Sequence, residues 1–232
     1  MAIKLFILGR PGSGKSSAAR HIASCVKTQD GTWIHINDYN FLYERFRKDI
    51  GGCFKETDYG GFKVIDFTVL DEALEYVGQQ AMDHYASELY DLVIVEFART
   101  NYSDALQKFD REFLHDAYFL FIETDVETCI RRINERVAHP EYPDDNFISD
   151  DVIDEYYKDD SRSYIEIDLL TEYNLKHRQV RIIDNMGTIA DFKVLLTEFI
   201  DYLIAIEKEA RKLRETDPIE VPIVRPNPEI AK

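Results

Sequence analysis

The feature that most constrains this chain is a glycine-rich loop close to its N-terminus. The loop reads Gly9-Arg10-Pro11-Gly12-Ser13-Gly14-Lys15-Ser16. An apolar stretch at residues 3–8 precedes it and predicts a buried strand, and residues 15–27 after it predict a helix. In a strand–loop–helix unit with this pattern, consecutive backbone N–H groups face inward and can surround a phosphate group. The sequence therefore predicts a phosphate-binding site at the start of this helix.

Each residue type in the loop has a physical reason to be there. Gly9, Gly12 and Gly14 allow the tight turn, and the first turn of the following helix adds its positive dipole end. We expect Lys15 to bridge the β- and γ-phosphates and the Ser16 hydroxyl to bind Mg²⁺. The remaining residues assigned to the nucleotide site are Arg10, Pro11, Ser13 and Ser17. The alternative, a glycine-rich turn without a ligand, is disfavoured by the complete match in its strand–helix context.

Apolar runs alternate with helical patterns along the chain, which is typical of a parallel sheet covered by helices. The predicted strands are residues 3–8, 32–36, 91–96, 117–123 and 179–183. The predicted helices are residues 15–27, 39–48, 69–89, 102–114, 126–138, 149–159, 161–174 and 188–214. Together they predict an α/β fold, a three-layer P-loop NTPase domain over residues 1–215 with a five-stranded, mainly parallel sheet and helices on both faces. Residues 49–66 read as a flexible excursion, and the proline-containing segment 216–232 as an extended or disordered tail.

The glycine loop resembles that of the adenylate-kinase-like group of P-loop kinases, which act on nucleotides, nucleosides and small metabolites. The form Gly-x-Pro-Gly-Ser-Gly-Lys-Ser is common in that group, and it also occurs in polynucleotide-kinase-like and zeta-toxin-like relatives. The resemblance extends over residues 1–205 and implies ATP and Mg²⁺ as cofactors. It also implies transfer of the γ-phosphoryl group to a small acceptor, which we expect to be a nucleotide or nucleoside. The alternatives are a kinase acting on nucleic-acid ends and a regulatory nucleotide-binding module.

An acidic residue follows the second predicted strand, where ligands of open α/β sheets bind. This residue is Asp38, and the resemblance implies that an acid here orients or deprotonates the acceptor hydroxyl. The alternative is that Asp38 caps the helix that begins at Tyr39, a role that Asp fills well. The region 39–89 is expected to bind the acceptor. Arg45 and Arg47 on that helix are candidates for contact with an anionic group of the acceptor.

A second acidic residue, Glu96, ends the strand 91–96 after a run of apolar residues. This pattern resembles the Walker B motif, in which a carboxylate holds Mg²⁺. Because many relatives carry Asp at this point, Glu96 could instead be the base in place of Asp38. Arg99 lies on the same loop and could contact the acceptor.

The helix 126–138 has an apolar stripe at helical spacing, formed by Val126, Cys129, Ile130, Ile133 and Val137. Arg132 and Arg136 are one turn apart and flank the stripe, whereas Arg131 points away. The pair resembles the arginine pattern that opens the mobile lid of these kinases, so we predict catalytic roles for both. The resemblance places the lid at residues 137–148, and Arg162 could join the cluster. The alternative is that the two arginines form salt bridges to nearby acids.

The last predicted strand is followed by Asp184-Asn185-Met186-Gly187. These residues resemble the loop that packs against adenine in P-loop kinases, so Asn185 is predicted to bind the nucleotide.

The composition restricts the classes of partner that this protein is expected to bind. The chain has 28 Lys and Arg against 44 Asp and Glu, a net charge of −16. A surface this acidic repels nucleic acid and anionic membranes. No apolar run reaches membrane-spanning length, and three cysteines without metal-like spacing are typical of reduced thiols, so we expect a cytoplasmic protein. Nothing in the sequence indicates the oligomeric state.

Overall fold

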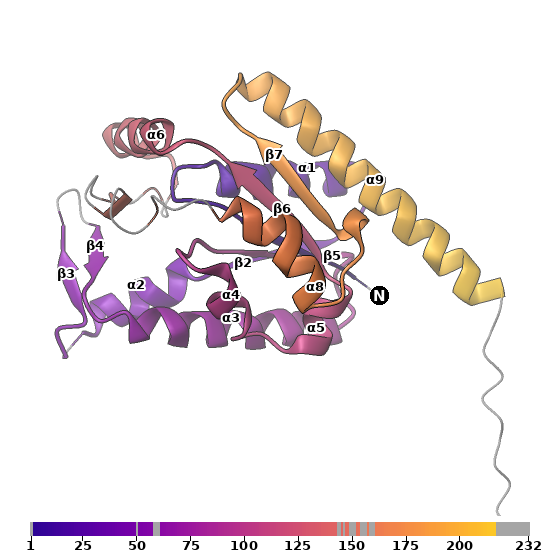
Figure 1. Cartoon of the computed structure of the whole chain (residues 1–232), viewed down its shortest axis with the longest axis horizontal. Helices are drawn as coiled ribbons and strands as arrows, with labels where there is room; N and C mark the ends of the chain where they lie inside the picture. The colour runs from indigo at the N-terminus through magenta and orange to yellow at the C-terminus, as the bar shows by residue number, and fades with distance from the viewer. Residues whose placement is uncertain are drawn as a thin grey trace, which may run out of the picture.

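The computed structural model describes most of the chain. The described residues are 2–49, 51–57, 61–142, 145, 147–148, 152–153, 157 and 161–216. Five parallel strands form the main sheet in the order β2-β5-β1-β6-β7 (Figure 1). Their bounds are β1 Ile3–Leu8, β2 Trp33–Asn37, β5 Leu92–Glu96, β6 Tyr118–Glu123 and β7 Val180–Asp184. The predicted five-stranded parallel sheet is thus confirmed, and β1, which leads into the glycine loop, lies at its centre.

Helices cover both faces of this sheet and complete the predicted three layers (Figure 1). On one face lie α1 (Lys15–Thr28) and the long C-terminal helix α9 (Ile189–Thr216), which contact each other. The helices on the other face are α3 (Thr68–Ala86), α4 (Tyr102–Leu106), α5 (Arg111–His115) and α8 (Leu169–Glu172). Among the described residues, the other helices are α2 (Tyr39–Arg47), α6 (Val126–Ala138), η2 (Tyr164–Asp168) and η3 (His177–Gln179).

The central strand contributes to both halves of the core. Phe6 and Leu8 pack on the α3 side of the sheet, and Leu5 and Ile7 pack on the side of α1 and α9. All four side chains are fully buried. Successive side chains of a strand point to opposite faces, so a strand covered on both faces needs apolar residues at every position. This requirement explains the unbroken apolar run before the glycine loop.

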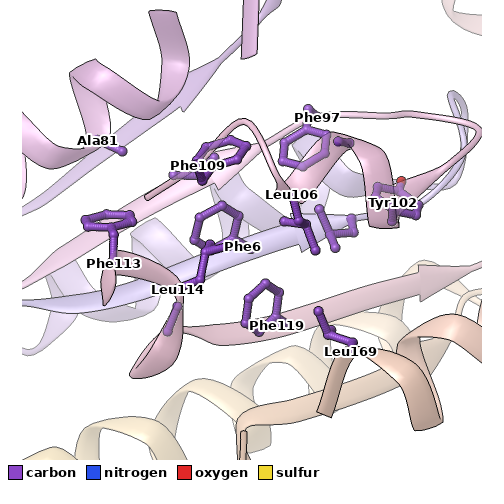
Figure 2. Close-up of a cluster of buried hydrophobic side chains, with 14 of the residues drawn as sticks. Phe6, Ala81, Phe97, Tyr102, Leu106, Phe109, Phe113, Leu114, Phe119 and Leu169 are labelled. Atoms are coloured by element: carbon purple, nitrogen blue, oxygen red, sulfur yellow. The ribbon is translucent and has the colours of Figure 1, made fainter. Parts of the chain in front are cut away.

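Aromatic rings fill the α3 side of the core. Figure 2 shows the ring of Phe6 surrounded by those of Phe109, Phe113 and Phe119. The centroid of the Phe6 ring lies 5.2 Å from that of Phe109 in an edge-on arrangement and 5.1 Å from that of Phe119 in a stacked one. Both distances fall in the range where aromatic pairs attract one another beyond simple burial. These contacts hold β1 in place, and with it the start of the glycine loop.

The structure departs from the predicted elements at three places. Residues 49–66, expected to be a flexible excursion, contain an antiparallel hairpin of two three-residue strands, β3 (Phe54–Glu56) and β4 (Phe62–Val64). The single helix predicted at 102–114 is two helices, because the Asp110 side chain caps the second by accepting from the Phe113 N–H. The helix predicted at 161–174 includes the π-helix η2.

Other predicted segments lie outside the described residues in whole or in part. They are most of the helix at 149–159, part of the lid at 137–148, and the tail beyond residue 216. In the part of the chain that the structure describes, no helix has the length and hydrophobicity needed to cross a membrane. The three cysteines are free thiols, with Cys129 buried and Cys25 and Cys53 half-buried.

Candidate active site

A cavity of about 910 Å³ lies at the carboxyl ends of β1, β2 and β5. Open α/β sheets bind ligands at this edge, at the point where the strand order reverses and strands are added on the other side of the first strand. Most of the predicted site residues line the cavity, namely Pro11, Gly12, Gly14, Lys15, Ser16, Ser17, Asp38, Glu96, Arg132 and Arg136. The other predicted residues, Gly9, Arg10, Ser13 and Asn185, contact the glycine loop or belong to it without lining the cavity.

The glycine loop adopts a conformation that requires glycine. Gly9, Gly12 and Gly14 have φ angles of 143°, 79° and 103°, which side-chain-bearing residues rarely adopt. A Cβ atom at Gly12 would lie 2.5 Å from the backbone oxygen of Cys129. The Tyr102 hydroxyl fixes the start of the loop, since it accepts from the Gly9 N–H at 2.8 Å and donates to the Gly9 oxygen at 3.1 Å. The backbone is thus held in the curved form that can surround a phosphate.

Lys15 begins α1 and is buried inside the loop. Its Nζ donates to the backbone oxygen of Arg10 at 2.8 Å. Burial lowers the pKa of the Lys15 ammonium below its ordinary value, although the negative charge of Glu96 acts in the opposite direction. A buried ammonium has few polar partners, and an anionic ligand in the loop would supply one. The position of Lys15 therefore suits contact with a bound phosphate.

Ser16 and Glu96 meet at the metal position that the sequence predicts. The Ser16 hydroxyl donates to Oε1 of Glu96 at 2.7 Å, and Oε2 of Glu96 lies 2.8 Å from Nε2 of His35. Burial alone would raise the pKa of the Glu96 carboxyl. The hydrogen bond and charge of His35 and the charge of Lys15 outweigh burial, so this pKa is held below its ordinary value.

These oxygens fit a magnesium ion. Mg²⁺ prefers a small number of protein oxygens and completes its shell with waters and phosphate oxygens. Ser16 and Glu96 supply a hydroxyl and a carboxylate beside the loop. Within the described ranges, no group of three or more His, Cys, Asp and Glu side chains could hold a metal by protein ligands alone. The pair of oxygens from Ser16 and Glu96 suits a metal whose remaining ligands come from a nucleotide and water.

Asp38 follows the end of β2, beside Glu96. The register of the parallel strands pairs Asn37 with Glu96, so Asp38 lies one residue beyond that pair. Although Asp38 is the N-cap residue that precedes α2, its side chain makes no capping hydrogen bond. It accepts instead from Nη1 of Arg99 at 2.6 Å. The capping interpretation of Asp38 therefore has no support, and the carboxylate is held at the cavity wall.

Arg99 is fixed by more than its ion pair. Nη1 also donates to the Ala98 oxygen at 2.6 Å, and Nη2 donates to the Leu70 oxygen at 2.9 Å. The Arg99 side chain is only 11% exposed, and that of Asp38 only 16%. A rigid, largely desolvated pair of this kind positions the carboxylate at a defined point in the cavity.

The arginines of α6 divide as the helical spacing predicts. Arg132 and Arg136 are half-buried and line the cavity, whereas Arg131 is exposed and does not. Nη2 of Arg132 donates to the Asn185 oxygen at 2.9 Å, and the charge of Arg136 is close enough to lower the pKa of Lys15. Both guanidinium groups therefore lie near the glycine loop, with their positive charge toward the cavity.

Asn185 supports the loop from the protein interior. Its buried Nδ2 donates to the Ser13 oxygen at 2.7 Å, and the Thr124 hydroxyl lies 3.2 Å from the same oxygen. The Arg10 side chain binds the backbone oxygens of Thr124 and Tyr157. These contacts tie the loop to the ends of β6 and β7. A contact between Asn185 and an adenine ring stays a prediction.

No protein-family model and no curated protein matches the sequence. The structure, in contrast, matches solved structures over most of its length. A gluconokinase from Sinorhizobium meliloti 1021 has 16% sequence identity and a TM-score of 0.53, with 87% of this chain and 93% of that chain covered. The chain has the fold of a P-loop kinase. A protein from Chloroflexus aurantiacus with a provisional kinase description has 11% identity and a TM-score of 0.50, with 87% of this chain and 97% of that chain covered.

Within this P-loop kinase fold, three arginines proposed for the site from the sequence lie elsewhere. Arg45 pairs with Glu72 and Arg47 is exposed, and neither lines the cavity. Arg162 binds Glu123 and Glu166 outside the cavity lining. Spacing on a helix predicts which residues share a face, but it does not predict the partner that each charge finds in the folded chain.

Two residues that contact the candidate site were not identified as functional from the sequence. His35 is aligned with Ile94 in the sheet, two positions before Glu96, so the side chains of His35 and Glu96 emerge on the same face. This alternation is a signal that strand pairing could have provided. Tyr102 holds Gly9 from a distance of 93 residues along the chain, and no local pattern indicates that contact.

Proposed function

We propose that this chain is an ATP-dependent kinase that transfers the γ-phosphoryl group to a hydroxyl group of a small acceptor. The proposal depends on one observation above all: the glycine loop, the Ser16–Glu96 pair and the Asp38–Arg99 pair face the same cavity. A nucleotide-binding switch would need the first two of these. It would not need a positioned carboxylate on the acceptor side.

Each group has a task in this reaction. Lys15 and the loop N–H groups would hold the β- and γ-phosphates, and Arg132 and Arg136 would offset charge on the group in transfer. Ser16 and Glu96 would hold Mg²⁺, which neutralises phosphate charge when bound. Asp38 would accept the proton of the acceptor hydroxyl while Arg99 keeps its carboxylate in place. The acceptor oxygen then attacks the γ-phosphorus and ADP leaves.

The acceptor is better described as a small metabolite than as a nucleotide or nucleoside. The gluconokinase with this fold is named for a non-nucleotide substrate, and the solved structures reported above give no support to the nucleotide or nucleoside predicted from the sequence. The net charge of −16 continues to disfavour a polynucleotide.

The test is a Lys15→Ala variant of the full chain. Wild-type protein should bind ATP·Mg²⁺ in calorimetry and release ADP faster when an acceptor is added. The variant should lose phosphoryl transfer and bind ATP more weakly, because the buried ammonium no longer meets the phosphates. Circular dichroism of the variant and of the wild type is the control that both proteins are folded to the same extent. Unchanged turnover in the variant would overturn the proposal.

A further inference from the structure

The acceptor side of the cavity has an apolar wall. Six side chains from α2, β4, α3 and the residue before α3 form this wall, and they are Leu42, Phe62, Val64, Phe67, Leu70 and Leu74. Leu42, Phe62 and Leu74 are otherwise buried, so their carbon surfaces face the cavity instead of bulk water. A second molecule bound beside a nucleotide would lie against carbon on this side.

The wall is backed by a rigid aromatic cluster. Leu42 and Phe62 belong to a small hydrophobic core of their own, against which Tyr39, Val64 and Leu70 pack. The Phe62 ring stacks on that of Phe46 at 5.2 Å between centroids. Packing of this kind holds side chains in fixed rotamers, so the shape of the wall is largely formed before any ligand binds.

The charges near the wall are mostly paired within the protein. Asp38 binds Arg99 at 2.6 Å, and Asp71 binds Lys108 at 2.8 Å. Lys63, on β4, also lines the cavity and adds one positive charge. The six wall side chains themselves offer a hydroxyl group no hydrogen-bond partner, and a buried polar group without a partner is unfavourable. Polar side chains that line the same cavity, such as Asn37, Thr57 and Asn101, lie outside the wall, so the wall itself favours a carbon surface.

Two further apolar side chains belong to the lining of this cavity. Phe147 and Ile148 line the same cavity, and the backbone nitrogen of Phe147 would lie 3.3 Å from a Cβ atom at Gly61. Gly61, the residue before β4, therefore lies close to Phe147, and Phe147 and Ile148 add apolar surface to the cavity. A cavity of about 910 Å³ is near the upper end of the usual range for ligand pockets, which leaves room for a small molecule beside a nucleotide.

We propose that the acceptor is an alcohol with an apolar, ring-sized body, which lies on the apolar wall while its hydroxyl group reaches Asp38. This inference rests on the proposed kinase function. The hydroxyl oxygen forms a bond to the γ-phosphorus of ATP, the bond between that phosphorus and the β–γ bridging oxygen breaks, and ADP leaves with the electron pair. The hydroxyl proton passes to the Asp38 carboxylate. Lys63 allows one acidic substituent on the body.

The test compares three sets of acceptors with the full chain and ATP·Mg²⁺. The first set is 2-phenylethanol, cyclohexylmethanol and phenyllactate, the second is gluconate and myo-inositol, and the third is adenosine and thymidine. Binding is followed by thermal shift with a non-hydrolysable ATP analogue, and transfer by ³¹P NMR of the product. We expect kcat/KM for members of the first set to exceed that for the other sets by tenfold or more.

A pair of neighbouring variants provides the matched control. Phe67 lines the cavity and Ile65 does not, although their exposures of 44% and 49% are similar. Phe67→Ser should raise the KM for the apolar alcohols about tenfold, because it removes contact area from the wall. Ile65→Ser should change neither this KM nor acceptor-independent ATP hydrolysis.

The outcomes separate this inference from the proposed function. Failure of the wild-type protein to bind ATP would overturn both. ATP binding that depends on Lys15, combined with a preference for polyols or nucleosides, would overturn the apolar acceptor and leave the kinase proposal standing. ATP binding without a thermal shift from any member of the first set would do the same, as would equal effects of the Phe67 and Ile65 variants.

Discussion

The hydroxyl of Ser16 donates to Oε1 of Glu96 across 2.7 Å and so joins the start of α1 to the end of β5. Ser16 lies in the helix that follows the central strand β1. Glu96 ends the neighbouring strand β5, where it pairs with Ile7 of β1. Because the strands are parallel, their carboxyl ends share one edge of the sheet. The chain thus brings a hydroxyl and a carboxylate together next to a loop suited to phosphate.

Glu96→Gln should raise the Mg²⁺ concentration needed for ATP binding. The substitution keeps the shape of the side chain but removes the negative charge that a divalent cation requires. Calorimetric titration of ATP at several Mg²⁺ concentrations would measure the shift, and residual ATP hydrolysis should fall in parallel. Equal Mg²⁺ dependence in variant and wild type would exclude Glu96 as a metal ligand.

Asp38→Asn should have a different effect. Its affinity for ATP·Mg²⁺ should remain near that of wild type, while acceptor phosphorylation falls about 10²–10⁴-fold, the usual range for a positioned base. Steady-state assays with and without acceptor would separate the two effects. If Mg²⁺ dependence instead follows Asp38 and acceptor transfer follows Glu96, the roles of the two carboxylates are reversed.

The arginines of α6 give a prediction about orientation. Replacement of Arg132 or Arg136 by Ala should lower kcat by roughly 10²-fold, because these charges act mainly on the transition state. Arg131→Ala, on the exposed side of the same helix, should have little effect. Far-UV circular dichroism would verify that all three variants fold. Similar kinetic losses in all three would contradict the assignment by helix face.

Two glycines with positive φ angles allow a matched test of the loop. Gly12 has φ of 79° and Gly52 has φ of 72°. A Cβ at Gly12 would lie 2.5 Å from the Cys129 oxygen, whereas one at Gly52 would meet nothing within 4 Å. Both Ala variants carry the backbone strain, but only Gly12→Ala adds a clash, so it should lose about 1–3 kcal/mol more stability. Urea unfolding would measure the difference, and equal losses would contradict the crowding at Gly12.

Cys129 should be the least reactive thiol of the folded protein. Burial raises its pKa to about 11, although the positive charge of Lys15 acts against this shift. Since the thiolate is the nucleophile, the protonated form at neutral pH reacts slowly. Maleimide labelling at pH 7 followed by mass spectrometry should modify the half-buried Cys25 and Cys53 first, and Cys129 only after unfolding. The stability that comes from the protonated thiol should decline as the pH rises from 9.0 toward 11.

Much of the fold could be predicted because its signals are local. The apolar run of β1, the glycine loop and the amphipathic face of α6 each lie within a short stretch of sequence. The hairpin of β3 and β4 was missed because three-residue strands leave no alternation to detect, and its stability comes from contacts such as Phe46 with Phe62.

The site could be predicted only in part, because some of its contacts join residues that are far apart in the sequence. Sequence position placed Asp38 and Glu96 at strand ends, which the structure confirms. Their partners could not be predicted, since Arg99 and His35 reach these carboxylates across 61 residues of chain. Pairing of this kind depends on strand order, and strand order is a property of the whole sheet.

The hairpin of β3 and β4 packs in a hydrophobic cluster of its own. Its aromatic cluster is separate from the two cores that flank the main sheet, and it carries part of the apolar wall. Substitutions there can alter the surface offered to an acceptor without disturbing the strand that leads into the glycine loop. Selectivity could therefore be redesigned by exchanging the segment between α2 and α3, while the half of the protein that contains the glycine loop is left unchanged.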